Sequence, residues 1–205
     1  TMSKAVAAFS TAQPIVGLPL GRQDEIGQLA RSFDHMQQQI HQQFTELQAN
    51  RQELEHLARF DALTGLPNRR LLMERLDNAL ERAKRTQTPL AVMFIDMDHF
   101  KAINDRWGHD AGDAALQWVA RQLLEHTRKT DTVARLGGDE FVVLLDSPAP
   151  VDQLASIAQK LLDGMREPWF FEGHLCNIEF SIGISLYPQD GDTVDALLSS
   201  ADAAM

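Results

Sequence analysis

Apolar residues recur every seven positions in the first third of the chain. One set of heptad positions is apolar throughout, and the second set is interrupted by Gln43 and Asn50. The first set is Ile26, Phe33, Ile40, Leu47 and Leu54, and the apolar members of the second are Leu29, Met36 and Leu57. This repeat, flanked by glutamines and charges, predicts a parallel coiled coil in which the two polar residues help to fix register. A single amphipathic helix packed on its own domain is the alternative.

Downstream of residue 60, helical and strand-like patterns alternate. They predict helices over residues 67–86, 111–126 and 151–166, a helix from about residue 193, and strands over 89–96 and 177–187. Residues 102–113 are polar and punctuated by glycines, which predicts a loop leading into the second helix. This order of elements predicts an α/β or α+β sandwich with a mixed, mainly antiparallel sheet.

Residues 132–146 contain two apolar runs separated by a short polar turn. The turn has Gly137 and Gly138 followed by Asp139 and Glu140. Paired glycines accept the positive φ angles of a tight turn, and they leave room for a ligand to approach the backbone. The segment therefore predicts a hairpin with an acidic tip, although most turns of this kind only connect strands.

Composition limits the function classes. The chain has 205 residues, a formal net charge of −10 and one cysteine, Cys176. The length allows a substantial core plus an appended element. The negative charge argues against binding to nucleic-acid polymers. A single cysteine excludes an intrachain disulfide, and we expect neither a signal peptide nor a membrane-spanning run in this sequence.

Acidic side chains follow two of the apolar runs. Asp96 ends an unbroken run that predicts a buried central strand, and Asp139 lies at the hairpin tip. If the strand pairs with the hairpin, the two carboxylates lie close together and repel each other unless a cation lies between them. Such oxygen ligands suit Mg²⁺ bound together with substrate phosphates. Two solvated strand-end acids are the alternative.

The segment after Asp96 carries groups that can read a nucleotide base. Asn104 has donors and acceptors, and Asp113 accepts two donors, which is what the edge of a purine requires. Taken alone, Asn104 is more often a helix cap and Asp113 a first-turn acid. His109, taken alone, is usually a polar surface group.

Five motifs, taken together and in this order, resemble the GGDEF family of diguanylate cyclases. They occupy residues 61–70, 94–105, 108–113, 135–141 and 180–185, and the resemblance covers about residues 60–205. It implies a ferredoxin-like nucleotidyl-cyclase sandwich that joins two GTP molecules into cyclic di-GMP with release of two pyrophosphates. Each domain of that family holds one GTP, so the resemblance also implies a homodimer with facing sites.

The same resemblance implies roles for single residues. Mg²⁺, or Mn²⁺ as the alternative ion, would be held by Asp96, the backbone carbonyl of Met97 and Asp139. Asp139 would also accept the proton of the ribose 3′-hydroxyl, while Lys101 would steady the phosphates and Glu140 would support the turn. Substrate binding would fall to Asn104, His109, Asp113, Gly137 and Gly138.

Arg128 and Asp131 have the spacing of the family's product-inhibition motif. By that resemblance they would form an allosteric site for cyclic di-GMP. The Arg128 guanidinium can fork onto phosphate or guanine acceptors, and Asp131 can accept from a guanine edge. A solvated charge cluster at a helix end is the alternative.

Residues 19–36 resemble the connector and second helix of a HAMP module. We therefore expect a partial HAMP-like module over residues 1–44, a coiled-coil linker helix over 45–60 and the GGDEF domain over 61–205. A HAMP module implies an upstream transmembrane sensor. The chain would then be the cytoplasmic part of a bacterial protein anchored in the inner membrane.

In the family, the last helix continues into Tyr-x-x-Lys and Gly-Arg-Asn segments that contact the phosphates, whereas this sequence stops at Met205. We therefore expect a C-terminally truncated domain that binds GTP weakly or is catalytically poor. Two other functions stay open: a catalytically silent regulator that binds GTP or cyclic di-GMP, and a dimerisation relay. The intact GGDEF turn favours the cyclase.

Overall fold

The computed structural model describes residues 20–145, 151–165, 168–176 and 178–205. The chain forms two compact units, Thr1–Glu55 and His56–Met205. The first part of the expected HAMP-like module, up to residue 19, lies outside the described residues. Among the residues that are described, no helix is both long enough and apolar enough to span a membrane.

The heptad repeat lies on one continuous helix, α2 (Glu25–Leu57). Asp24 begins it, because its Oδ1 accepts a hydrogen bond from the backbone N–H of Gly27 at 3.1 Å. Apart from Phe33, which is half-buried, the apolar heptad side chains are exposed in the single chain; Leu47 and Leu54 are 66% and 67% exposed. The exposed ones can pack against a second helix.

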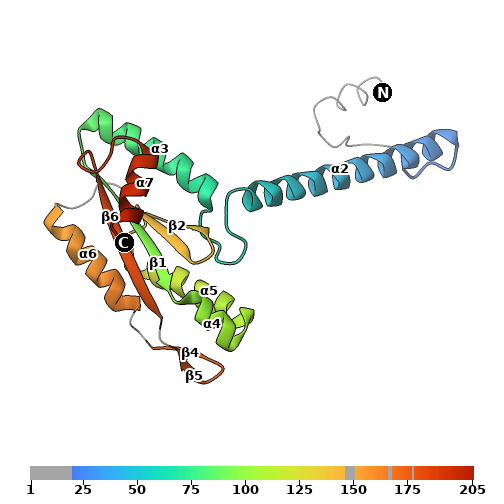
Figure 1. The fold of residues 1–205 in the computed structure, drawn as a ribbon. Coiled ribbons are helices and arrows are strands. Elements are labelled where there is room, and N and C mark those ends of the chain that lie inside the picture. Colours follow the sequence, from blue (N-terminus) through green and yellow to red (C-terminus); the bar gives the residue numbers. More distant parts are fainter. Residues whose placement is uncertain (1–19, 146–150, 166–167, 177) are drawn as a thin grey trace. The chain divides into compact units, whose positions relative to one another are not determined.

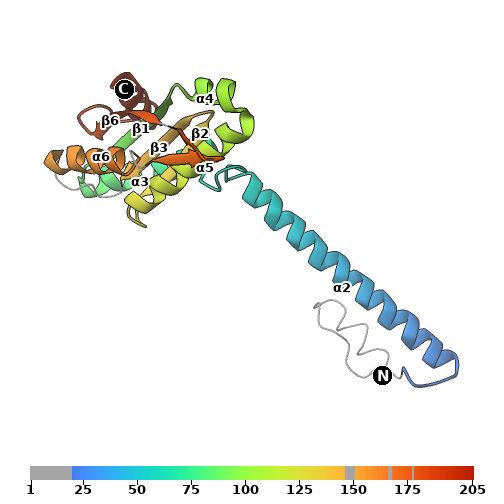
Figure 2. The ribbon, with the colours of Figure 1, turned by 90° about the horizontal axis from the view of Figure 1, so that it is seen from below.

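The second unit is built on a four-stranded sheet with the order β2-β3-β1-β6 (Figures 1 and 2). The strands are β1 (Leu90–Asp98), β2 (Thr132–Gly137), β3 (Glu140–Leu145) and β6 (Glu179–Tyr187). All three pairings are antiparallel, and β1 lies between β3 and β6. The predicted α+β class with a mainly antiparallel sheet is confirmed.

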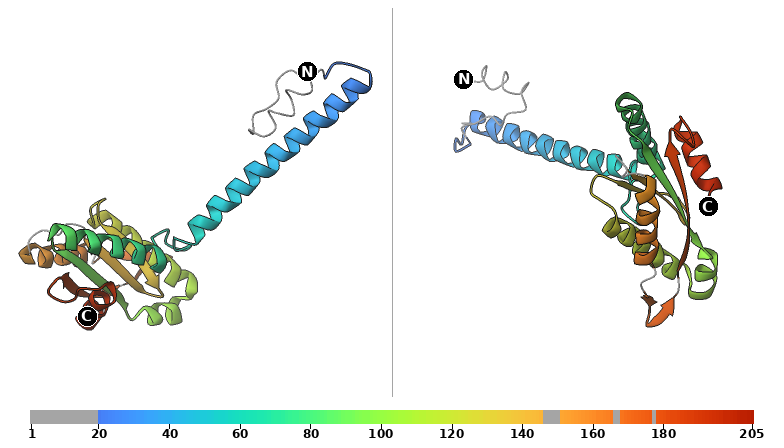
Figure 3. Two further views of the ribbon diagram at one scale, coloured as in Figure 1. Left: turned by 90° about the horizontal axis from the view of Figure 1, so that it is seen from above. Right: turned by 90° about the vertical axis from the view of Figure 1, so that its left-hand side faces the viewer.

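Helices cover both faces of this sheet. Helices α5 (His109–His126) and α6 (Val151–Met165) pack on one face, where β1 contributes Ala91, Met93 and Ile95. Helices α3 (Arg69–Thr86) and α7 (Val194–Ala203) pack on the other, where Leu90, Val92 and Phe94 point. The right-hand view of Figure 3 shows α6 and α7 on opposite sides. Because successive side chains alternate between two buried faces, residues 90–95 of β1 have to be apolar.

Two elements differ from the sequence-based expectation. Residues 100–107 form a helix, α4 (Phe100–Trp107), where a loop was predicted. Its polar sequence hides three partly buried residues, Phe100, Ile103 and Trp107, that pack against the core. A small hairpin of β4 (Trp169–Phe171) and β5 (His174–Cys176) was not predicted, since three-residue strands carry too little periodicity. Cys176 is buried in it.

Helix and strand ends shift by a few residues. The first predicted helix of this unit begins at Arg69 and not at residue 67, because Asn68 is its N-cap and its Oδ1 accepts from Leu71 N at 3.1 Å. The last predicted strand begins at Glu179.

Candidate active site

The Gly-Gly turn joins β2 to β3 at one end of the sheet. Gly137 and Gly138 have φ angles of 152° and 53°, which confirms that the turn uses the freedom of glycine. A Cβ atom added to either residue would meet no atom within 4 Å. The space above the turn backbone is therefore open to a ligand.

Asp96 and Asp139 come together beside this turn, as the sequence predicted. Asp96 lies opposite Glu140 in the β1–β3 pairing, and Met97 N donates to the carbonyl oxygen of Asp139 at 3.4 Å. Partial burial raises the pKa of Asp96 above its ordinary value of 3.8, and the negative charges of Asp139, Asp98 and Glu140 raise it further. A cation bound here would relieve that repulsion.

The donor set fits a magnesium ion. Asp96 and Asp139 offer carboxylate oxygens, whereas the side chain of Met97 is buried in the core, so that only its carbonyl could serve as a ligand. Asp98 is held elsewhere, because its Oδ1 accepts from Ser181 Oγ at 2.9 Å. Within the described parts of the chain, no group of three or more His, Cys, Asp or Glu side chains is suited to a metal. Mg²⁺ commonly takes only one or two carboxylates and completes its shell with phosphates and water.

Helices α4 and α5 carry the predicted catalytic residue Lys101 and the three substrate-binding residues that lie outside the turn. Lys101 is exposed on α4, while His109 and Asp113 are exposed in the first two turns of α5. Asn104 is half-buried inside α4 and is not a helix cap. Its side chain lies against Gly112, since a Cβ added there would be 2.0 Å from Asn104 Oδ1. The structure therefore brings Asn104 against Gly112, the residue that precedes Asp113 in the first turns of α5.

Arg128 and Asp131 form a closed turn between α5 and β2. Asp131 Oδ2 accepts from Arg128 N at 2.9 Å, and Asp131 N donates to the carbonyl oxygen of Arg128 at 2.9 Å. Arg128 is exposed. The Asp131 side chain therefore stabilises the backbone of this turn, in addition to any ligand that the motif binds.

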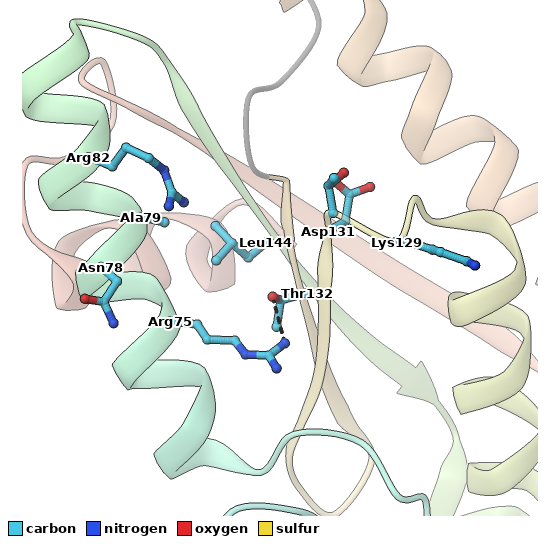
Figure 4. A pocket seen from close by; sticks show the side chains of 9 residues that line it. Arg75, Asn78, Ala79, Arg82, Lys129, Asp131, Thr132 and Leu144 are labelled. Atoms are coloured by element: carbon cyan, nitrogen blue, oxygen red, sulfur yellow. Dashed lines mark hydrogen bonds between the residues drawn. The ribbon is translucent and has the colours of Figure 1, made fainter.

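A pocket of about 280 Å³ lies beside that turn, at the end of β2 opposite the Gly-Gly turn (Figure 4). It is lined by Asp131 and Thr132 and, from α3, by Arg75 and Arg82 among others. Arg75 Nη1 donates to Thr132 Oγ1 at 3.1 Å. In Figure 4, the side chain of Lys129 points away from the two arginines. The pocket places two guanidinium groups near Asp131.

Sequence reasoning missed Arg135 in β2. Its Nε and Nη2 donate to the carbonyl oxygen of Gly138 at 3.0 and 2.7 Å, and its Nη1 donates to Asp61 Oδ1 at 2.9 Å. An arginine two residues before a Gly-Gly turn, inside an apolar strand, was the available signal. Burial alone would raise the pKa of Asp61, but hydrogen bonds from Thr64 and Arg135 outweigh burial and lower it.

Comparisons with known proteins identify two families along the chain. Residues 58–205 match the family described as diguanylate cyclase, GGDEF domain, and residues 2–42 match the HAMP domain. The bifunctional diguanylate cyclase/cyclic di-GMP phosphodiesterase MucR of Pseudomonas aeruginosa is 47% identical over 161 residues, which cover 78% of this chain and 23% of MucR. Diguanylate cyclase TpbB of the same species is 42% identical over 182 residues, covering 88% of this chain and 42% of TpbB.

A solved structure shows the same fold. The coiled coil and GGDEF domain of DgcB from Caulobacter crescentus, in complex with c-di-GMP, aligns with a TM-score of 0.69 at 25% identity, covering 82% of this chain and 91% of that one. The chain spans less than half the length of MucR or TpbB. The match over residues 58–205, together with the acid-flanked Gly-Gly turn, shows that the chain belongs to the GGDEF family of diguanylate cyclases, here preceded by a HAMP domain.

Proposed function

We propose that this protein is a diguanylate cyclase that condenses two GTP molecules into cyclic di-GMP and two pyrophosphates. The observation that carries the proposal is the convergence of Asp96 and Asp139 beside an open Gly-Gly turn. Nucleotidyl transfer needs charge neutralisation and in-line positioning more than covalent catalysis. Two carboxylates, an exposed lysine and an exposed turn backbone are suited to that task.

Asp139 would act as the proton acceptor for the ribose 3′-hydroxyl. The 3′-oxygen then bonds to the α-phosphorus of the facing GTP, and the bond from that phosphorus to pyrophosphate breaks. Mg²⁺, or Mn²⁺, held by Asp96, Asp139 and the carbonyl of Met97, would neutralise charge on the phosphates. Lys101 would add a cation at the phosphates, and Glu140, opposite Asp96 in the strand pairing, would support the turn.

The base would be read by α4 and α5. Asn104 and Asp113 offer complementary donors and acceptors to a guanine edge, and His109 lies at the start of the same helix as Asp113. The packing of Asn104 against Gly112 supports this role, because it holds the amide at the N-terminal end of α5.

A two-fold homodimer would complete the reaction. One domain would bind one GTP, and the product needs two nucleotides joined symmetrically. The exposed heptad residues of α2 would supply the contact, with Gln43 and Asn50 fixing its register. Through the HAMP domain, the dimer would respond to an upstream sensor, which we propose to be anchored in the membrane.

Product would regulate the enzyme at Arg128 and Asp131. The pocket beside Asp131 supports this assignment, since Arg75 and Arg82 line it and guanidinium groups suit phosphates. Arg128 is exposed at the neighbouring turn, where its guanidinium would bind the product.

The test is product formation by the full-length protein. It is incubated with GTP and Mg²⁺, and cyclic di-GMP is measured by mass spectrometry, next to Asp139→Asn and to Asp110→Asn as a matched control. Asp110 is an exposed first-turn acid of α5 outside the proposed site. We expect product from the wild type and from Asp110→Asn only. Absence of product from the wild type, or equal product from Asp139→Asn, would refute the cyclase assignment.

A further inference from the structure

The segment that follows α2 is folded back on itself by backbone hydrogen bonds. Asp61 N donates to the carbonyl oxygen of Leu66 at 2.8 Å, and Gly65 N donates to that of Asp61 at 2.9 Å. Phe60 and Pro67 form an isolated antiparallel bridge. Residues 58–68, which we call the strap, are therefore a closed loop.

The two ends of the strap are joined to each other. Asn68 N donates to the carbonyl oxygen of Arg59 at 2.9 Å, and Asn68 Nδ2 donates to that of Ala58 at 3.1 Å. The same Asn68 is the N-cap of α3. Helix α2 ends at Leu57, so the strap is the segment that follows it directly in the chain.

Arg135 joins the strap to the catalytic turn. Its backbone N–H donates to the carbonyl oxygen of Pro67 at 3.0 Å. Its guanidinium uses one nitrogen for Asp61 and two for the carbonyl oxygen of Gly138. The Arg135 and Asp61 side chains are only 11% and 24% exposed, so water competes weakly for these bonds.

The hydrogen bonds from Arg135 hold the carbonyl oxygen of Gly138, which belongs to the peptide group between Gly138 and Asp139. The next carbonyl is held by β1, because the carbonyl oxygen of Asp139 accepts from Met97 N. The carbonyl oxygens of Gly138 and Asp139 are therefore both held by hydrogen bonds, one from Arg135 and the other from Met97. The orientation of this peptide is one determinant of the direction of the Asp139 side chain. Hydrogen bonds from Thr64 and Arg135 lower the pKa of Asp61, which favours its ionised form.

We propose that Asp61 and Arg135 are positioning residues, and that the strap passes displacement at the end of α2 to the Gly138–Asp139 peptide. The catalytic consequence rests on the proposed function. The mechanical link itself does not, because it can be measured on the turn backbone without any reaction.

The link is tested first with Arg135→Lys. A lysine keeps the charge but lacks the planar fork that bonds Asp61 and Gly138 at once. We expect hydrogen exchange of the turn peptide over residues 135–141 to speed up about 10-fold. In the cyclase assay, kcat should fall about 10- to 100-fold with KM for GTP within about twofold, since the defect is in orientation.

Two further variants serve as a control and as an independent test of the same contact. Arg70→Lys is the matched control. Arg70 pairs with Glu74 at 3.6 Å in an exposed position, and the variant should behave as wild type. Asp61→Asn can still accept from Thr64 and should show the same direction of change as Arg135→Lys with a smaller size. Unchanged exchange of the turn in Arg135→Lys and in Asp61→Asn, with native melting temperatures, would overturn the proposal.

Transmission is tested by changing the phase of α2. One alanine inserted between Glu46 and Leu47 rotates the following helix by about 100°, whereas a seven-residue repeat of 40–46 restores the heptad phase. We expect turn exchange and cyclase rate to differ about fivefold between the two insertions. In an Arg135→Lys background, that ratio should fall to about one.

A ratio that persists in the Arg135→Lys background would show that the strap does not transmit the change. The two hypotheses can fail separately. Turn exchange that responds as expected, without cyclic di-GMP from any protein, would remove the cyclase assignment and keep the strap. Cyclic di-GMP formation together with turn exchange that neither insertion changes would keep the cyclase assignment and remove the strap proposal.

Discussion

Replacing Gly112 by alanine should displace the proposed base-reading amide without unfolding the domain. A Cβ at residue 112 would lie 2.0 Å from Asn104 Oδ1, 2.9 Å from Asn104 Cγ and 3.2 Å from Phe100 Cζ. Carbon and oxygen atoms in ordinary contact are about 3.5 Å apart, so the amide has to move by roughly 1.5 Å. Hydrogen bonds to a guanine edge do not survive a displacement of that size.

The expected cost falls on nucleotide binding. Losing a well-aligned pair of hydrogen bonds to a base costs about 1–3 kcal/mol, so affinity for GTP should drop about 5- to 150-fold. Stability should change little. Alanine is better than glycine inside a helix by about 0.5–1 kcal/mol, and that gain offsets part of the local crowding near Phe100.

The assay combines calorimetric binding of a non-hydrolysable GTP analogue with thermal unfolding. A double-mutant cycle with Asn104→Ala decides whether the alanine acts through Asn104. In the Asn104→Ala background, Gly112→Ala should cost no further affinity. If it costs as much there as in the wild type, or if it leaves affinity unchanged while Asn104→Ala lowers it, the reasoning about Asn104 is wrong.

Three other predictions follow from the site and the stalk. Asp96→Asn should raise the melting temperature in EDTA at neutral pH, because a carboxylate whose pKa rises on folding costs stability when ionised; the gain should shrink as the pH falls toward 3.8, and Mg²⁺ should stabilise the wild type only. Arg128→Ala should raise the cyclic di-GMP level reached at steady state; equal inhibition by added product in both proteins would contradict the feedback site. Replacing Gln43 and Asn50 by leucine should tighten the dimer, seen by analytical ultracentrifugation, and make activity less responsive to the upstream signal; an unaltered response with a tighter dimer would identify α2 as a passive tether.

The sequence predicted those parts of the site that depend on local order. The glycine turn could be predicted from the sequence because positive φ angles at Gly137 and Gly138 are a local backbone requirement. The buried strand could be predicted because an apolar run such as residues 90–95 is stable in a sheet only when both faces of the sheet are covered. The heptad repeat placed α2 for the same reason, since its period is a property of one segment.

Elements with a weak periodicity of apolar residues could not be predicted from the sequence. Helix α4 was predicted as a loop because only three of its residues pack against the core, and that packing exists only once the sheet and α5 are in place. The hairpin of β4 and β5 has strands too short to show a pattern.

The sequence alone determined that a Gly-Gly turn, two strand-end acids and a seven-residue repeat occur together in one chain, because each of these is written in neighbouring residues. Tertiary structure decided which groups meet. The pairing of β1 with β3 brings Asp96 to Asp139, and the packing of α4 on α5 sets Asn104 against Gly112. Arg135 reaches Asp61, 74 residues away, only because the strap folds back beside β2. Contacts across such distances depend on how the elements pack, and no local pattern records them.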